Sequence, residues 1–143
     1  MCSSDLRRGT GVQVRPLDLT DVHVLVVDDH ADTLELFSTS LLTFGAKVLT
    51  ARSARDALTI VKTVRVNAMV SDLAMPGEDG LWLIQQLRRL KHEQGGSIPA
   101  IAVTAHRDRY AAGRVTDLGF EAFLTKPVDP FDLARAVASL VGR

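Results

Sequence analysis

The sequence alternates short apolar runs, rich in β-branched residues, with longer stretches whose apolar residues recur at a helical period. This alternation starts near residue 22 and repeats five times before the chain ends. A helix that follows each strand carries the chain back to start the next strand in the same direction, so repeated strand–helix units form a parallel sheet. The sequence therefore predicts an α/β fold with helices on both faces of the sheet.

The boundaries of these units follow from capping and stop signals. Gly45 and Gly119 follow apolar helical patterns and suit left-handed helix ends, Ser53 suits an N-cap, and Pro130 suits the first turn of a helix. The strands are expected at residues 24–27, 47–50, 68–71, 99–104 and 122–125. The helices are expected at about residues 31–44, 53–64, 81–90, 107–118 and 130–141.

The first strand is apolar on both faces, as is typical of an interior strand of a parallel sheet. Right-handed crossovers then favour a doubly wound, flavodoxin-like sheet with strand order 2-1-3-4-5. In such sheets ligands bind beyond the carboxyl ends of the strands, at the point where the strand order reverses. Asp28 and Asp29 follow the first strand and Asp72 follows the third, so these acids are expected to meet at that point.

Composition excludes several classes of function. Lys plus Arg and Asp plus Glu both number 17, so no overall field attracts nucleic acid or an anionic membrane. No apolar run approaches the roughly 18 residues that a membrane-spanning helix needs, and the single Cys2 suits a reducing compartment such as the cytoplasm. Residues 1–20 are rich in Gly, Arg, Ser and Thr and are expected to form a tail or linker that adds little to the core of a domain at residues 21–143.

Three carboxylates at one edge of a sheet repel one another unless a cation compensates them. Mg²⁺ prefers oxygen ligands and is commonly held by one or two protein carboxylates together with water and phosphate. Asp28, Asp29 and Asp72 suit that role, although Asp28 and Asp29 taken alone equally suit a turn or a helix cap. The three acids together predict a site for Mg²⁺.

The fourth and fifth strands bring two further groups to the same edge. Thr104 ends the fourth strand, and Lys126 follows the fifth. A hydroxyl, an ammonium and a divalent cation can together contact the three oxygens of a phosphoryl group in transfer, which needs positioning and charge neutralisation. Asp72 would then be the nucleophile.

These segments resemble the receiver domain of two-component response regulators over about residues 22–141. The resemblance is carried by Val-Leu-Val-Val-Asp-Asp at 24–29, Ser-Asp-Leu-Ala-Met-Pro-Gly-Glu-Asp-Gly at 71–80, Val-Thr-Ala at 103–105 and Lys-Pro at 126–127. It implies that Asp72 accepts a phosphoryl group, that Asp28, Asp29, Asp72 and the backbone carbonyl of Ala74 hold Mg²⁺, and that Thr104 and Lys126 contact the phosphoryl group.

The resemblance also implies a switch, in which Thr104 moves toward the phosphoryl group and Phe123 rotates into the vacated space. Many relatives carry tyrosine at the switch position, and we expect the apolar Phe123 ring to be more exposed at rest and to bury on phosphorylation. In the resembling family, the positions of Ala74 and His106 tune how fast water removes the phosphoryl group. A solvated cap of the fourth helix suits His106 better than that role.

The partners implied by the resemblance are a histidine kinase or a histidine phosphotransfer protein upstream and a protein effector downstream. The upstream partner is expected to dock on the first helix near Leu34 and Phe37. The effector is expected on the face formed by helix four, strand five and helix five, with homodimerisation through that face left open. The isolated domain is expected to catalyse only its own phosphorylation and dephosphorylation. The chain ends soon after the last helix, which suits a single-domain regulator or the receiver of a hybrid histidine kinase.

Three other classes of protein fit the sequence less well. A haloacid-dehalogenase-type phosphatase needs an Asp-x-Asp motif after the first strand, whereas Asp28 is followed by Asp29 and His30. A dinucleotide-binding module needs its glycines after the first strand, whereas Gly9 and Gly11 precede it. A binding module that signals without phosphorylation would be expected to lack one of the acids, the threonine or the lysine, and all are present.

Overall fold

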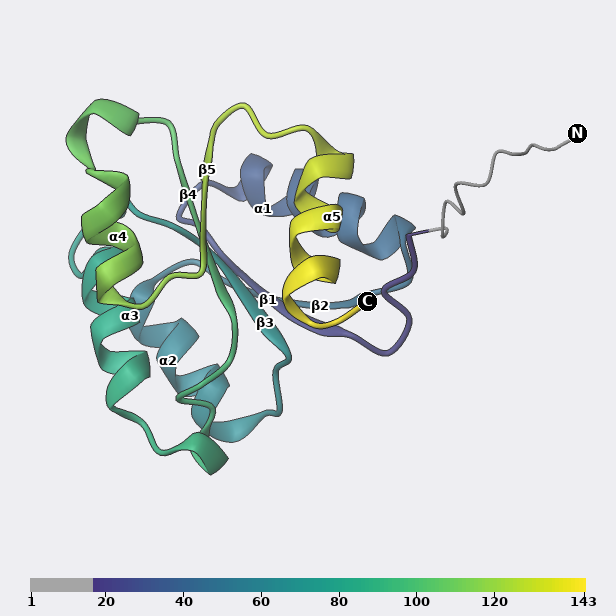
Figure 1. Cartoon of the computed structure of the whole chain (residues 1–143), viewed down its shortest axis with the longest axis horizontal. Coiled ribbons are helices and arrows are strands. Elements are labelled where there is room, and N and C mark those ends of the chain that lie inside the picture. The colour runs from purple at the N-terminus through teal and green to yellow at the C-terminus, as the bar shows by residue number, and fades with distance from the viewer. Residues whose placement is uncertain (1–16) are drawn as a thin grey trace, which may run out of the picture.

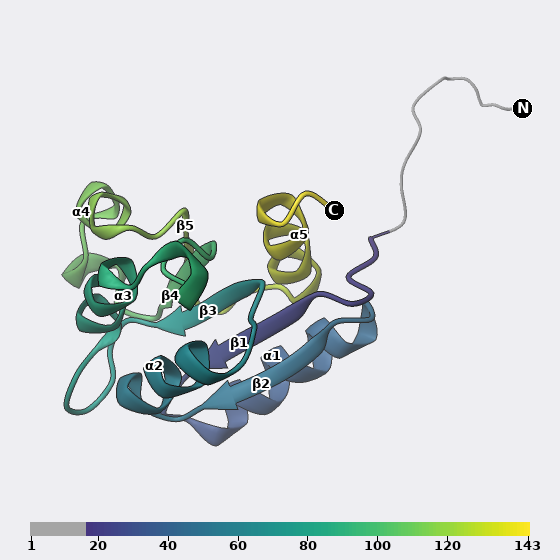
Figure 2. The ribbon, with the colours of Figure 1, turned by 90° about the horizontal axis from the view of Figure 1, so that it is seen from below.

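The computed structural model describes residues 17–143 and contains one parallel sheet of five strands in the order β2-β1-β3-β4-β5, which confirms the predicted topology. The expected tail at residues 1–16 lies outside the described residues. The strands are β1 (His23–Val27), β2 (Lys47–Ala51), β3 (Ala68–Asp72), β4 (Ala100–Thr104) and β5 (Ala122–Thr125). Figure 2 shows β2, β1 and β3 side by side, with their arrowheads pointing the same way.

Two layers of helices cover the sheet (Figure 1). The helices are α1 (Ala31–Thr43), α2 (Ala54–Thr63), α3 (Gly80–Arg89), α4 (Ala112–Leu118) and α5 (Pro130–Leu140), with short 3-10 turns η1 (His92–Gln94) and η2 (Arg107–Arg109). Helices α1 and α5 pack on one face of the sheet, and α2, α3 and α4 pack on the other. None of the helices between residues 17 and 143 is long and apolar enough to cross a membrane.

Alternation along each strand divides the core between the two faces. Val24 and Val26 of β1 join the cluster under α1 and α5, whereas Leu25 and Val27 join the cluster under α2, α3 and α4. All four side chains are buried, as expected for a strand with a parallel neighbour on each side. Two-sided burial holds the strand register, because a slip by one residue would exchange the faces.

The segment just before β1 contributes to the core, contrary to the prediction. Leu19 is completely buried in the cluster under α1 and α5, and its backbone N–H donates to the carbonyl of Phe44 at 2.7 Å. Gly45 has a positive φ of 96°, and a Cβ there would lie 2.9 Å from Thr20 Oγ1. The chain before β1 therefore packs closely against the end of α1, and the domain includes residues 17–20.

Helix four is shorter than predicted. Arg107–Arg109 forms the 3-10 turn η2, and α4 begins only at Ala112. The backbone N–H of His106 donates to Thr104 Oγ1 at 2.9 Å, which holds the chain against the end of β4, and the residue before α4, Ala111, makes no side-chain cap. Strand β4 likewise begins at Ala100 rather than at Pro99, which lacks the N–H needed for strand pairing.

Candidate functional site

Two neighbouring strands bring the acids together. Asp28 follows β1 and Asp72 ends β3, and Val27 of β1 pairs with Ser71 of β3 in the sheet. The side chains of Asp28 and Asp72 are only 1% and 5% exposed, whereas that of Asp29 is 24% exposed. The structure thus places the three predicted acids at one edge of the sheet, where strand order reverses.

Lys126 joins them from the loop after β5. Its Nζ lies 2.8 Å from Asp28 Oδ2 and 3.9 Å from Asp72 Oδ1. Its backbone N–H donates to the carbonyl of Thr104 at 2.9 Å, which fixes the start of this loop against the end of β4. The ammonium therefore bridges the acids of two strands and offsets part of their charge.

Thr104 is completely buried at the end of β4. Its hydroxyl oxygen accepts a hydrogen bond from the backbone N–H of His106, whose side chain is exposed. Thr104 thus contacts both loops that leave this edge, the β4–α4 loop through its hydroxyl and the β5–α5 loop through its carbonyl.

The loop after Asp72 depends on a close backbone approach. Asp79 caps α3 by accepting a hydrogen bond from the Trp82 backbone N–H at 2.9 Å, and Gly80 donates to the carbonyl of Leu73. A Cβ at Gly80 would overlap the carbonyl of Asp72 and lie 2.8 Å from the Cα of Leu73. Glycine at this position lets α3 start directly beside the acid.

The environment of Asp72 disfavours its charged form. Burial raises the pKa of the Asp72 carboxyl, the nearby Lys126 ammonium lowers this pKa, and Asp28 raises it further. A hydrogen bond from the backbone of Ala74 lowers the pKa, and Asp29 adds a smaller rise. The net direction is upward, because the single lysine does not compensate both burial and two neighbouring acids.

His30 was not predicted to belong to this site. Its Nδ1 lies 3.1 Å from Asp28 Oδ1 and 3.3 Å from Asp29 Oδ1, and its backbone N–H donates to Asp28 Oδ1 at 2.9 Å. The signal was present in the sequence, because an imidazole directly after two acids at a strand end adds a third side chain that can bind a metal.

The donor set fits a divalent cation. Asp28, Asp29, His30 and Asp72 each offer one atom, and these four atoms lie within 4.8 Å of one another. Asp29 Oδ1 is buried and has no hydrogen-bond partner, which leaves its lone pairs available. Mg²⁺ prefers such carboxylate oxygens, so the residues present suit the predicted ion.

The other predicted site residues lie around this cluster. Phe123 is half-buried and packs against the core under α2, α3 and α4, and Ala74 is half-buried after Asp72. The roles expected for Phe123 in switching and for Ala74 and His106 in dephosphorylation stay predictions.

Docking of a partner on α1 near Leu34 and Phe37 stays a prediction. These two side chains are themselves only 7% and 4% exposed and belong to the core. Leu36 of the same helix is 53% exposed. The sequence pattern identified the apolar stripe of α1 correctly, but this stripe faces the sheet.

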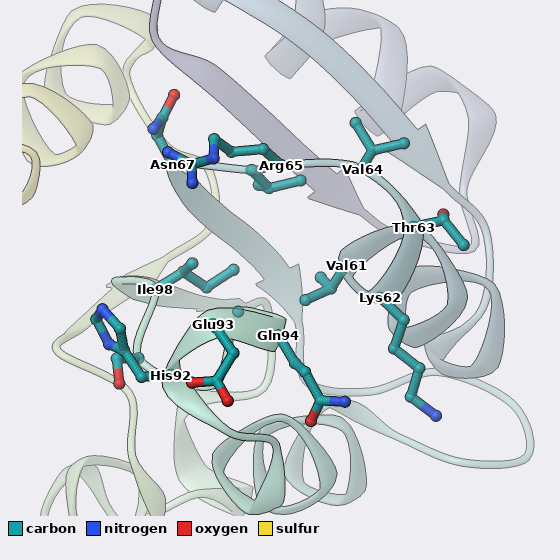
Figure 3. Close-up of a pocket in the computed structure, with 13 residues that line it drawn as sticks. Val61, Lys62, Thr63, Val64, Arg65, Asn67, His92, Glu93, Gln94 and Ile98 are labelled. Carbon is teal, nitrogen blue, oxygen red and sulfur yellow. The ribbon is translucent and has the colours of Figure 1, made fainter.

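A cavity of about 550 Å³ lies elsewhere, between the end of α2 and η1 (Figure 3). Its lining includes Asn67, just before β3, and Ile98, shortly before β4. It is therefore at the opposite edge of the sheet from Asp72. It contains none of the predicted site residues.

Comparisons with known proteins agree with this geometry. A family model described as "Response regulator receiver domain" matches residues 24–138. An uncharacterized 14.6 kDa protein of Leptolyngbya boryana is 43% identical over 122 residues, which cover 83% of this chain and 89% of that protein. The sensor histidine kinase GacS of Pseudomonas protegens is 31% identical over 152 residues, and the match covers 99% of this chain but only 17% of the kinase.

Solved structures give the same result. The crystal structure of a response regulator receiver protein from Pseudomonas putida superposes with a TM-score of 0.76 at 32% identity, covering 84% of this chain and 98% of that one. The likeness extends over almost the whole of that protein.

Proposed function

The chain belongs to the response regulator receiver domain family of two-component signalling, and from this premise we propose that Asp72 accepts a phosphoryl group from a phosphohistidine. The ion that assists would be Mg²⁺, held by Asp28, Asp29, Asp72 and the backbone carbonyl of Ala74. One observation carries the proposal. Lys126 Nζ lies 2.8 Å from Asp28 Oδ2 and 3.9 Å from Asp72 Oδ1. A positive charge therefore lies next to the acids at the ends of β1 and β3, where it can contact a phosphoryl group on Asp72.

The transfer forms a bond between a carboxylate oxygen of Asp72 and phosphorus. The phosphorus–nitrogen bond of the donor breaks, and its electron pair remains on the imidazole of the donor. Mg²⁺, when bound, neutralises charge on the phosphoryl oxygens. Lys126 contacts an oxygen of the same group and moves away from Asp28 to do so, and the Thr104 hydroxyl donates to another oxygen.

Burial of Asp72 suits the product. Water is largely excluded from a side chain that is 5% exposed, so the acyl phosphate is shielded from hydrolysis on most sides. His106 lies in the exposed β4–α4 loop, from which it can orient or exclude the attacking water. Its proposed effect is on the lifetime of the phosphoryl group.

The hydrogen bond to Thr104 supports a route from Asp72 to the effector face. When the Thr104 hydroxyl turns to the phosphoryl group, it no longer accepts from the His106 backbone N–H. The β4–α4 loop is then released from the end of β4, and Phe123 enters the space beside Thr104. We propose that the face of α4, β5 and α5 changes in this way and binds an effector in its phosphorylated form.

The upstream partner is a protein that presents a phosphohistidine, either a histidine kinase or a histidine phosphotransfer protein. Leu36 offers it an exposed apolar contact on the first half of α1, the half that follows Asp28 and Asp29 in the sequence. Leu42 is similarly exposed but lies six residues later, about 9 Å further along the helix. We expect Leu36→Asp to slow transfer from the phosphohistidine partner and Leu42→Asp to slow it less, with phosphorylation by acetyl phosphate unchanged in both.

The direct test is incubation with acetyl phosphate and Mg²⁺, followed by measurement of the protein mass. The wild type is expected to gain one phosphoryl group, and Asp72→Asn is expected to gain none. Asp56→Asn removes an exposed acid on α2 and serves as the matched control, which should react like the wild type. No mass gain in the wild type would instead favour a module that keeps this fold and signals without phosphorylation.

A further inference from the structure

His30 contacts both acids that follow β1, yet the phosphoryl transfer proposed above assigns it no part. Its Nδ1 is 3.1 Å from Asp28 Oδ1 and 3.3 Å from Asp29 Oδ1. The ring is otherwise open, since the side chain is 67% exposed. Nδ1 lies within hydrogen-bonding distance of Asp28 Oδ1, and the backbone N–H of His30 donates to the same oxygen at 2.9 Å, so the ring is held beside both acids.

The spacing of these atoms matches the shell of a small divalent ion. With metal–ligand bonds of about 2.1 Å in octahedral geometry, neighbouring ligand atoms are about 3.0 Å apart and opposite ones about 4.2 Å. The two separations at Nδ1 fit neighbouring positions on one ion. Asp72 adds a fourth atom, and all four lie within 4.8 Å of one another, a bound somewhat wider than the distance between opposite ligands.

Two carboxylates of this group have oxygen lone pairs left for a cation, although the backbone of Ala74 already donates to Asp72. Asp29 Oδ1 is buried without a hydrogen-bond partner. Asp72 is 5% exposed, and its nearest cation, Lys126 Nζ, is 3.9 Å away. The oxygen without a partner is the one next to Nδ1, so a cation that binds Asp29 Oδ1 would lie within reach of the imidazole.

We propose that His30 Nδ1 is a ligand of the divalent cation and makes this site select nickel(II) and similar first-row ions over magnesium. Imidazole nitrogen suits such ions, whereas Mg²⁺ gains little from exchanging a water for nitrogen. The exposed Nε2 can carry the ring proton in water, which leaves the Nδ1 lone pair free for the metal. This inference rests on the proposed function to the extent that the same acids hold the cation.

The test measures binding of Ni²⁺ alone and of Mg²⁺ alone by calorimetry to the untagged protein. His30→Ala is expected to weaken Ni²⁺ binding by at least about tenfold and to change Mg²⁺ binding by less than about twofold. His30→Gln, which keeps a polar side chain, should behave like His30→Ala. His92→Ala removes another exposed imidazole, from η1, and should leave both affinities unchanged.

A second measurement identifies the ligand directly. Bound Mn²⁺ should show nitrogen coupling in electron spin echo spectra of the wild type and of His92→Ala, and none in His30→Ala. An unchanged ratio of Ni²⁺ to Mg²⁺ affinity in His30→Ala, together with absent nitrogen coupling in the wild type, would overturn the role of His30.

The two proposals fail in different ways. If Asp72 takes no phosphoryl group but the His30-dependent Ni²⁺ site is found, the proposed function fails and the metal inference stands. If Asp72 is phosphorylated with Mg²⁺ and the ratio of Ni²⁺ to Mg²⁺ affinity is the same with and without His30, only the metal inference fails.

Discussion

Replacing Lys126 with methionine should destabilise the metal-free protein, because it removes the cation beside two buried acids. The ammonium lies 2.8 Å from Asp28 Oδ2, and the Asp28 side chain is 1% exposed. At an effective dielectric constant of about 20, a pair at this distance attracts by about 6 kcal/mol before desolvation is counted. Removing one partner of a buried pair generally costs about 3–5 kcal/mol.

The lower end of that range applies here. Lys126 is 19% exposed, so water already screens part of the attraction, and we expect a loss of about 3 kcal/mol in the free energy of unfolding. Added Mg²⁺ should restore part of the lost free energy of unfolding. Since the acids of Lys126→Met lack their lysine, a divalent ion binds the folded variant more tightly and stabilises it more than it stabilises the wild type.

Urea unfolding with a chelator and then with Mg²⁺ measures both effects. Lys62→Met replaces an exposed lysine on α2 and should change the free energy of unfolding by less than about 0.5 kcal/mol. Equal unfolding midpoints for Lys126→Met and the wild type in chelator would refute the argument, because the Asp28 contact would then contribute nothing.

Three further predictions concern other parts of the fold. Burial raises the pKa of the Asp72 carboxyl, so its ionisation lowers the stability of the folded state as pH rises from the ordinary aspartate value of 3.8 through the raised pKa. In chelator at pH 7, Asp72→Asn should therefore have a larger free energy of unfolding than the wild type. This difference should vanish as pH falls to 3.8. Leu19→Ala should lower the free energy of unfolding by about 2–5 kcal/mol in urea titrations, whereas the exposed Leu36→Ala should cost less than about 0.5 kcal/mol. His106→Ala should change the decay rate of the phosphoryl group on Asp72 without preventing its formation, and an unaltered decay would make His106 an ordinary surface residue.

The fold and the grouping of the acids were predictable because they depend on periodicity and on chain direction. Parallel strands end at the same edge of the sheet, so the backbone alone brings Asp28 and Asp72 together at the ends of β1 and β3. The positions of Thr104 and Lys126 follow from the same rule. Strand β5 is the parallel neighbour of β4, and Thr104 pairs with Thr125, the residue before Lys126.

Features that depend on three-dimensional packing were missed. Leu19 has polar neighbours in the sequence, so no apolar run marks it as buried. The hydrogen bond from its backbone N–H to the carbonyl of Phe44 holds it against the end of α1, where its side chain is buried. Docking is expected near Leu34 and Phe37, yet these two side chains are themselves turned to the sheet, so the exposed side chains of α1 around them would make the contact. The delayed start of α4 at Ala112 accompanies the hydrogen bond between Thr104 and His106, a local side-chain turn over two residues that competes with a helix start.

The central claim is that Asp72 is the residue that carries the phosphoryl group, and locating the modified residue tests it most directly. After reaction with acetyl phosphate and Mg²⁺, borohydride reduction converts an aspartyl phosphate to homoserine, which peptide mass mapping can place in the chain. We predict homoserine at position 72 alone. Homoserine at position 28 or 29, or at no position, would contradict the account.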